Sequence, residues 1–155
     1  MKIVNAIPEM GGLSKAEIDS FLESRLNVQL ATVDEMGEPN IQPVWFYHDK
    51  NANELYVVTN KMGKKVRNLR SKPIVYFSID DENFPYKGVK GKGATTILED
   101  AESITPIAEK INMKYLGTLD HPIAKMIMEN AGNGTEVALK IKPKFFSTWD
   151  FAKAQ

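Results

Sequence analysis

Residues 28–59 read VQLATV DEMGEP NIQPVWFYH DKNAN ELYVVT, which is three apolar stretches separated by two polar turns. β-Branched and aromatic residues fill the apolar stretches, as is typical of strands. Gly37 in the first turn suits a backbone with positive φ. Strands that follow one another through short turns usually pair as antiparallel neighbours. The segment therefore predicts a β-meander with strands at 28–33, 40–48 and 54–59.

The segments on either side extend this pattern. Ser14 to Glu17 have the sequence of a capping box, which predicts a helix over about 15–25 that covers the core. Thr105 followed by Pro106 predicts the N-cap and first residue of another helix. The other elements that we expect are a helix at 63–70, strands at 74–80 and 87–99, helices at 105–116 and 122–130, and strands at 137–141 and 145–151.

These elements predict a mainly β fold in one domain over residues 1–155. The strands are joined mostly as a meander and no βαβ repeat is present, which favours an antiparallel barrel with peripheral helices over a doubly wound sheet. We expect six to seven mostly antiparallel strands, with the N-terminal helix at about 14–25 and the barrel at about 28–151.

Composition excludes several classes of function. Twenty Lys and Arg balance twenty Asp and Glu, so the formal net charge is zero and nucleic acid is not an expected partner. The absence of cysteine excludes disulfides, thiolate nucleophiles and cysteine-based metal sites. The first residues lack the apolar run of a signal peptide, and no stretch approaches the length of a membrane span. We therefore expect a cytoplasmic protein with no membrane partner.

The segment from Thr59 to Lys65, TNKMGKK, carries the strongest chemical signal. It lies where a predicted strand ends and a predicted helix begins. A helix N-terminus has free N–H groups and partial positive charge, so Lys64 and Lys65 stand where a fold chosen for stability alone would place acidic residues. A bound phosphate explains that placement, with Thr59 as a further donor and Gly63 allowing close approach. A solvated basic turn explains it equally well, and the segment is neither a P-loop nor a Rossmann motif.

Two further segments admit a ligand. Gln42 to Phe46, QPVWF, places a proline within a predicted strand, which indicates an edge strand along which a planar ligand can lie. The glycines of residues 88–93, GVKGKG, indicate a bulge or a bend of the barrel. His48 and His121 lack the spacing of metal ligands, and no Ser-His-Asp set or nucleophile elbow is present. The chain thus has the character of a protein whose chemistry comes from a cofactor.

The order of these motifs resembles the pyridoxamine 5′-phosphate oxidase-like family of FMN-binding split barrels. The resemblance runs over residues 14–151 and rests on PVWF at 43–46, VTN at 58–60, KKVRNL at 64–69, YKGVKGKG at 86–93 and the ending from Lys142-Pro143 to Trp149-Asp150. It implies a homodimer with FMN at the subunit interface, no metal and no catalytic side chain. The cofactor-binding residues that it implies are Gln42, Pro43, Val44, Trp45, Val58, Thr59, Lys64, Lys65, Ser78 and Trp149.

The chain also departs from this family. Gly63-Lys64-Lys65 replaces the usual Ser-Arg-Lys, which leaves point charges without the bidentate fork of arginine. No arginine follows Trp149, although the vitamin-forming oxidases grip the substrate phosphate with arginines there. The resemblance therefore implies a flavin-dependent oxidoreductase acting on some small substrate other than pyridoxamine phosphate. A reductase that uses the deazaflavin coenzyme F-420 is an open alternative, and so is a non-catalytic protein that binds flavin, F-420 or haem.

Overall fold

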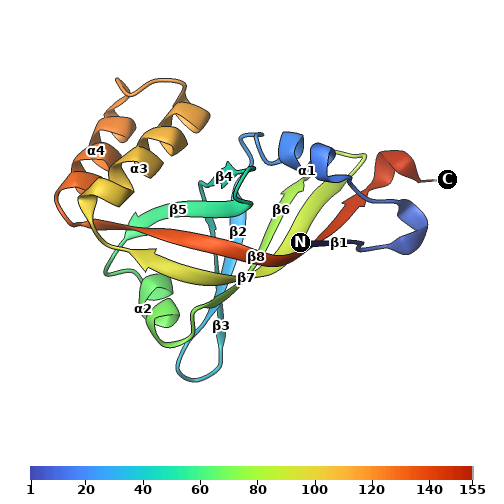
Figure 1. Cartoon of the computed structure of the whole chain (residues 1–155), viewed down its shortest axis with the longest axis horizontal. Coiled ribbons are helices and arrows are strands. Elements are labelled where there is room, and N and C mark those ends of the chain that lie inside the picture. The colour runs from blue at the N-terminus through green and yellow to red at the C-terminus, as the bar shows by residue number, and fades with distance from the viewer. Residues whose placement is uncertain (155) are drawn as a thin grey trace.

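One β-sheet organises the chain, and the structure, a computed structural model, describes residues 1–154 of it (Figure 1). The strands are β1 Lys2–Asn5, β2 Val28–Val33, β3 Pro39–Val44, β4 Tyr47–Asp49, β5 Glu54–Asn60, β6 Ile74–Asp81, β7 Lys87–Leu98 and β8 Glu136–Asp150. The helices are α1 Lys15–Phe21, α2 Lys64–Ser71, α3 Ala101–Leu116 and α4 Pro122–Gly132. Short 3-10 turns lie at Pro8–Met10 and Phe151–Lys153.

The sheet coils into a split barrel, which confirms the predicted fold class. Its strand order is β3-β2-β6-β7-β8-β5-β4, with β1 added in parallel to the end of β8 and all other pairs antiparallel. The two edge strands, β3 and β4, are consecutive in the chain and are joined by Trp45 and Phe46. The proline at position 43 therefore lies on an edge strand, as expected, where its missing N–H leaves no partner unpaired.

The apolar alternation of the strands places the main core inside the barrel. β2 alternates between buried and half-buried residues along its whole length, and α1 and α2 close the ends with Ile18, Val66 and Leu69. A second, smaller core lies where α3 and α4 pack as a hairpin on β5 and β8, around Ile104 and Ala138. None of the helices within residues 1–154 is long and apolar enough to cross a membrane.

The observed strands differ from the predicted ones in three ways, each caused by tertiary contacts. The predicted strand 40–48 breaks at Trp45 into β3 and β4, which lie at opposite edges of the sheet. The two predicted strands 137–141 and 145–151 are one strand, β8, in which Pro143 pairs with Gly93 and a register shift between Lys92 and Gly93 leaves Lys144 without a partner in β7. β1 was not expected at all, since four residues that gain a partner only at the far end of β8 leave little local signal.

Two helix boundaries also differ from the prediction. The capping box at Ser14 is present, but α1 ends at Phe21 rather than near residue 25. α3 begins four residues before Thr105, because Asp100 caps it by accepting from the Ser103 N–H at 2.9 Å. Pro106 consequently lies inside the helix and not at its first position, so the proline signal marked the right helix and the wrong boundary.

The glycines of β7 allow other groups to approach the strand closely. A Cβ at Gly88 would lie 2.2 Å from the indole of Trp149, and one at Gly91 would lie 2.3 Å from the carbonyl oxygen of Phe145. Both neighbours belong to β8, which runs beside β7 across the molecule (Figure 1). The glycine-rich segment thus serves the packing of β7 on β8, in agreement with the barrel-bend interpretation.

Candidate functional site

The segment between β5 and α2 folds back on itself through three backbone contacts. Lys61 N donates to Thr135 O at 3.0 Å, Met62 N to the Asn60 side chain at 2.8 Å and Gly63 N to Asn60 O at 3.1 Å. These bonds place the start of α2 beside the end of β5 and the beginning of β8. Gly63 is the N-cap, and no side chain among residues 1–154 caps α2. The first-turn N–H groups, together with the positive end of the helix dipole, therefore remain available to an anion.

Lys65, in the first turn of α2, is buried, with only 6% of its surface exposed to solvent. Its Nζ donates to Oε1 of Gln42 on β3 at 2.9 Å, so two predicted cofactor residues from distant parts of the chain meet here. Burial lowers the pKa of Lys65, and the negative charge of Glu136 opposes that change. The positive charge of a buried ammonium is not fully compensated by a neutral amide. An anionic ligand would supply the missing negative charge.

Glu136, the first residue of β8, is the acidic member of this cluster. It lies opposite Asn60 in the sheet, and its Oε2 is buried with no hydrogen-bond partner among the described residues. Burial raises the pKa of Glu136, while Lys65 and a contact with Asn130 of α4 act in the opposite direction. Sequence reasoning missed this residue, because an acid at the start of a strand carries no motif and only the fold brings it to α2.

Lys64 has a different environment from its neighbour Lys65. Its side chain is half exposed, and its Nζ lies 3.8 Å from the carboxylate of Asp34 in the β2–β3 turn. An ion pair of this length at the surface contributes little to stability. Backbone N–H groups of the same turn hold the pKa of Asp34 low, with smaller contributions from Lys64 and Lys72. Lys64 can therefore turn toward a ligand at α2 with little loss elsewhere.

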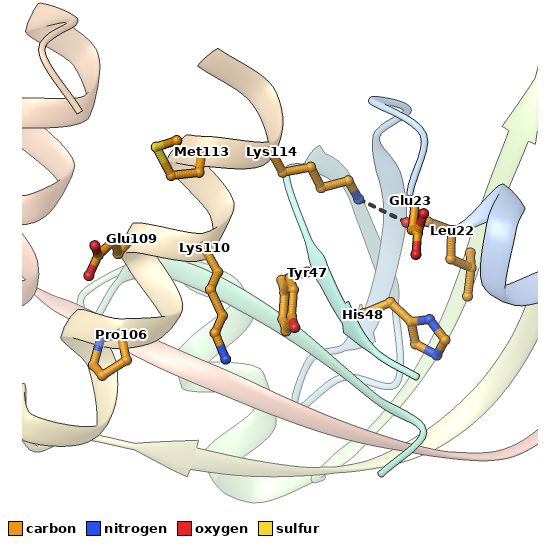
Figure 2. A pocket seen from close by; sticks show the side chains of 9 residues that line it. All are labelled: Leu22, Glu23, Tyr47, His48, Pro106, Glu109, Lys110, Met113 and Lys114. Atoms are coloured by element: carbon orange, nitrogen blue, oxygen red, sulfur yellow. Dashed lines mark hydrogen bonds between the residues drawn. The ribbon is translucent and has the colours of Figure 1, made fainter. Parts of the chain in front are cut away.

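A half-buried lysine, Lys114 in the last turn of α3, holds the break between β3 and β4. Its Nζ donates to the carbonyl oxygens of Leu22 and Phe46, both at 3.0 Å, and lies 3.5 Å from the centre of the Phe46 ring. Burial lowers the pKa of Lys114 to about 7. Figure 2 shows the side chain reaching from α3 toward the residues at the end of α1.

Tyr115, next to Lys114, holds the same break through its ring and its hydroxyl. The ring stacks on Trp45 with centroids 4.7 Å apart and planes 3° from parallel. The hydroxyl donates to Leu26 O at 2.7 Å and accepts from Phe46 N at 3.2 Å. Burial raises the pKa of Tyr115 to about 12, so the hydroxyl stays protonated at neutral pH. Trp45, a predicted ring-contact residue, is thus positioned by α3, a helix that sequence reasoning did not connect to the site.

A cavity of about 690 Å³ lies between α3, β4 and the end of α1, and Figure 2 shows nine side chains that line it. Lys114 and Lys110 come from α3, Tyr47 and His48 from β4, and Glu23 from the end of α1. None of the ten predicted cofactor residues lines it. A second hollow, of about 440 Å³, lies on the outer face of the sheet and includes Ser78. The cavity beside α3 and the lysines at the start of α2 are therefore separate places.

Comparison with known proteins now decides the family. The family model described as pyridoxamine 5′-phosphate oxidase matches residues 14–150, which is most of the chain. The chain belongs to this family.

Solved structures agree with the family assignment. The conserved hypothetical protein Rv2991 from Mycobacterium tuberculosis has a TM-score of 0.80 and 25% identity, over 95% of this chain and 90% of that one. An F-420 reductase has a TM-score of 0.67 and 28% identity, over 83% and 94%. HutZ, a haem storage protein from Vibrio cholerae, shares the fold with a TM-score of 0.65 at 19% identity, over 83% and 89%. No curated protein sequence matches the chain significantly.

Within this pyridoxamine 5′-phosphate oxidase family member, the predicted ring contacts are divided between two faces of β3. Successive side chains of a strand alternate, so Gln42 and Val44 lie on one face and Pro43 on the other. Pro43 shares its outward row with Gln29 of β2 and Ser78 of β6. A ligand beside β3 therefore meets some of these side chains and the edge of the backbone, but not all of the side chains at once.

The other three predicted residues fall in three different places. Thr59 precedes the last residue of β5, close in sequence to the start of α2. Val58 packs with the second core, under the α3–α4 hairpin. Trp149 lies on β8 twelve residues beyond Val137, the pairing partner of Thr59, which at about 3.3 Å per residue is up to roughly 40 Å along the strand. The start of α2 and Trp149 therefore lie toward opposite ends of β8.

Metal binding has no support in the described part of the chain. Residues 1–154 contain no group of three or more His, Asp or Glu side chains arranged to hold an ion. His121 caps α4 by accepting from the Ile123 N–H at 3.0 Å, and His48 is buried beside Asn53 and Phe146.

Proposed function

We propose that this chain is a flavin-binding oxidoreductase that holds FMN at the interface between two copies of itself. The observation that carries the proposal is the buried Lys65, whose ammonium faces the neutral Gln42 beside an uncapped helix N-terminus. A phosphate fits this arrangement because it satisfies the free N–H groups of α2 and supplies the negative charge that Lys65 lacks. Family membership supports the same reading.

In this proposal the protein binds and orients, and the cofactor supplies the redox chemistry. Bound flavin provides hydride transfer to or from a small substrate. Lys65, Lys64 and the first turn of α2 hold the phosphate, with Thr59 as a further donor. The edge of β3 supports the ring, and the Trp45–Tyr115 stack fixes the end of that strand. No side chain is proposed as a catalytic acid or base.

The positions of the predicted residues support a homodimer. Trp149 and the lysines of α2 lie toward opposite ends of β8, and a second copy would bring a Trp149 to the cofactor from the other side. The outer face of the sheet offers a surface for the second copy. Ile41 and Tyr76 are 67% and 54% exposed there, beside the hollow that includes Ser78. Ile41→Asp should yield a monomer by light scattering and weaken FMN binding together with dimerisation.

The proposal is tested by an absorption spectrum of the purified protein and by titration with FMN. We expect a bound flavin, or submicromolar FMN binding, that Lys64→Ala/Lys65→Ala abolishes. The double variant Lys142→Ala/Lys144→Ala removes the same charge from exposed positions of β8 and should bind normally. A folded protein that binds neither FMN nor F-420 would contradict the proposal.

A second candidate is a reductase that uses F-420. The 28% identity with an F-420 reductase favours it. Lys61 and Arg67, exposed on either side of the start of α2, provide positive charge for a longer anionic tail. Titration with F-420 in place of FMN separates the two candidates, because F-420 should then bind at least ten times more tightly than FMN.

A further inference from the structure

The carboxyl group of Glu136 is the least satisfied group near the start of α2. Its Oε2 is buried and unpartnered within the described residues, although buried carboxylate oxygens normally accept two or more hydrogen bonds. The charged group that acts on it is Lys65 of α2, and the polar one is Asn130 of α4. Its strand neighbour Asn60 adds no charge. Among the described residues Glu136 and Lys65 form no ion pair of 4.0 Å or less, so each compensates the charge of the other only in part.

An incoming phosphate ester upsets this balance. It carries about −1.5 to −2 charges at neutral pH. Lys65 is one positive charge, and it would then face both the phosphate and the carboxylate of Glu136. Two anions in one partly buried site cannot both remain fully ionised, so one of them takes up a proton. Glu136 is the better acceptor, because burial already raises its pKa.

We propose that Glu136 is the proton-accepting residue of the phosphate site, and that binding of a phosphate ester beside Lys65 is coupled to uptake of one proton by Glu136 Oε2. The inference rests on the proposed function only in the identity of the ligand. The proton comes from solvent and neutralises the carboxylate, which removes its repulsion of the bound phosphate. No bond other than O–H forms and no redox change occurs. Affinity for the phosphate ester consequently falls as pH rises.

Calorimetric titration with FMN at pH 8 tests the coupling, in two buffers with different enthalpies of ionisation. The difference in apparent binding enthalpy gives the number of protons taken up. The wild type should take up close to one proton more than Glu136→Gln, whose amide is neutral without a proton from solvent. The Kd of the wild type for FMN should rise by up to about tenfold per pH unit in the range where one full proton is taken up. The Kd of Glu136→Gln for FMN should change little with pH. Glu129→Gln, an exposed acid on α4, is the matched control and should behave as wild type.

Equal proton uptake in the wild type and in Glu136→Gln would overturn the inference, and so would Glu136→Gln binding FMN much more weakly at every pH. Titration with inorganic phosphate, followed by the ¹³C resonance of the Glu136 carboxyl, separates this inference from the proposed function. If FMN and F-420 do not bind but phosphate protonates Glu136, the flavin proposal fails and the inference stands. If phosphate leaves the resonance and its pH titration unchanged, the inference fails as well.

Discussion

Two lysines, the half-buried Lys114 and the buried Lys65, lie at opposite ends of their helices and have different surroundings. Lys114 ends α3 and satisfies two backbone carbonyls and an aromatic face. Lys65 begins α2, donates to one neutral amide and lies near a carboxyl oxygen without a partner. Lys114 donates two hydrogen bonds within the chain, whereas Lys65 donates only one. Buried polar groups with full partners indicate a structural role, and those without indicate a ligand site.

The largest effect that we expect is on folding, at Lys114. Lys114→Met keeps the apolar stem but leaves the carbonyls of Leu22 and Phe46 without their donor. Each buried carbonyl left unpaired costs about 1–3 kcal/mol, so unfolding in urea should show a loss of about 2–4 kcal/mol. Lys110→Met, one turn away and exposed, should change stability by less than about 0.5 kcal/mol. Equal stability of both variants would remove Lys114 as a structural element.

The same substitution at Lys65 should affect binding instead. Lys65→Met removes a charge-assisted contact to the phosphate, worth about 1.5–3 kcal/mol, so the Kd for FMN should rise by roughly 10- to 150-fold. Stability without ligand should change by less than about 1 kcal/mol, because the ammonium has no charged partner in contact. Fluorescence titration and urea unfolding measure the two quantities. A strong loss of stability with unchanged affinity would reverse the assignment of the two lysines.

A smaller effect is expected at Tyr115. Tyr115→Phe retains the stack on Trp45 but removes the hydroxyl that bonds Leu26 O and Phe46 N. We expect a loss of about 1 kcal/mol in the free energy of unfolding. The Kd for FMN should stay within about threefold of wild type, since the stack positions Trp45. A larger loss of affinity would show that the hydroxyl, and not the ring, positions this strand.

The smallest effect concerns the pH dependence of stability. The pKa of Lys114 is about 7 in the folded chain and ordinarily 10.5. Between these values the unfolded chain binds a proton that the folded chain lacks, so this group makes stability rise with pH over that window. Partial exposure to solvent reduces the size of the effect. The stability difference between wild type and Lys114→Met, measured at pH 7, 8 and 9, should therefore grow with pH. A constant difference would contradict the lowered pKa.

Local chemistry predicted the parts of the fold whose signals lie within a few residues. The capping box at Ser14, the strand at 28–33 and the anomalous lysines at the start of α2 are signals of this kind, and each appears where it was expected. The strand break at Trp45 was not predictable in this way. It depends on bonds from α3, about seventy residues away, which replace the sheet partners that the backbone of Phe46 loses.

The sequence by itself determined the barrel and its edge strand, and it predicted an anion site at the first turn of α2. These depend on alternation, capping and charge, which are properties of neighbouring residues. Only the tertiary structure decided that Gln42 and Glu136 join Lys65, that α3 positions Trp45, and that Trp149 and the start of α2 lie toward opposite ends of β8. The physical reason is that burial and missing partners are set by residues distant in sequence, and these two properties decide which charged side chains are available to bind.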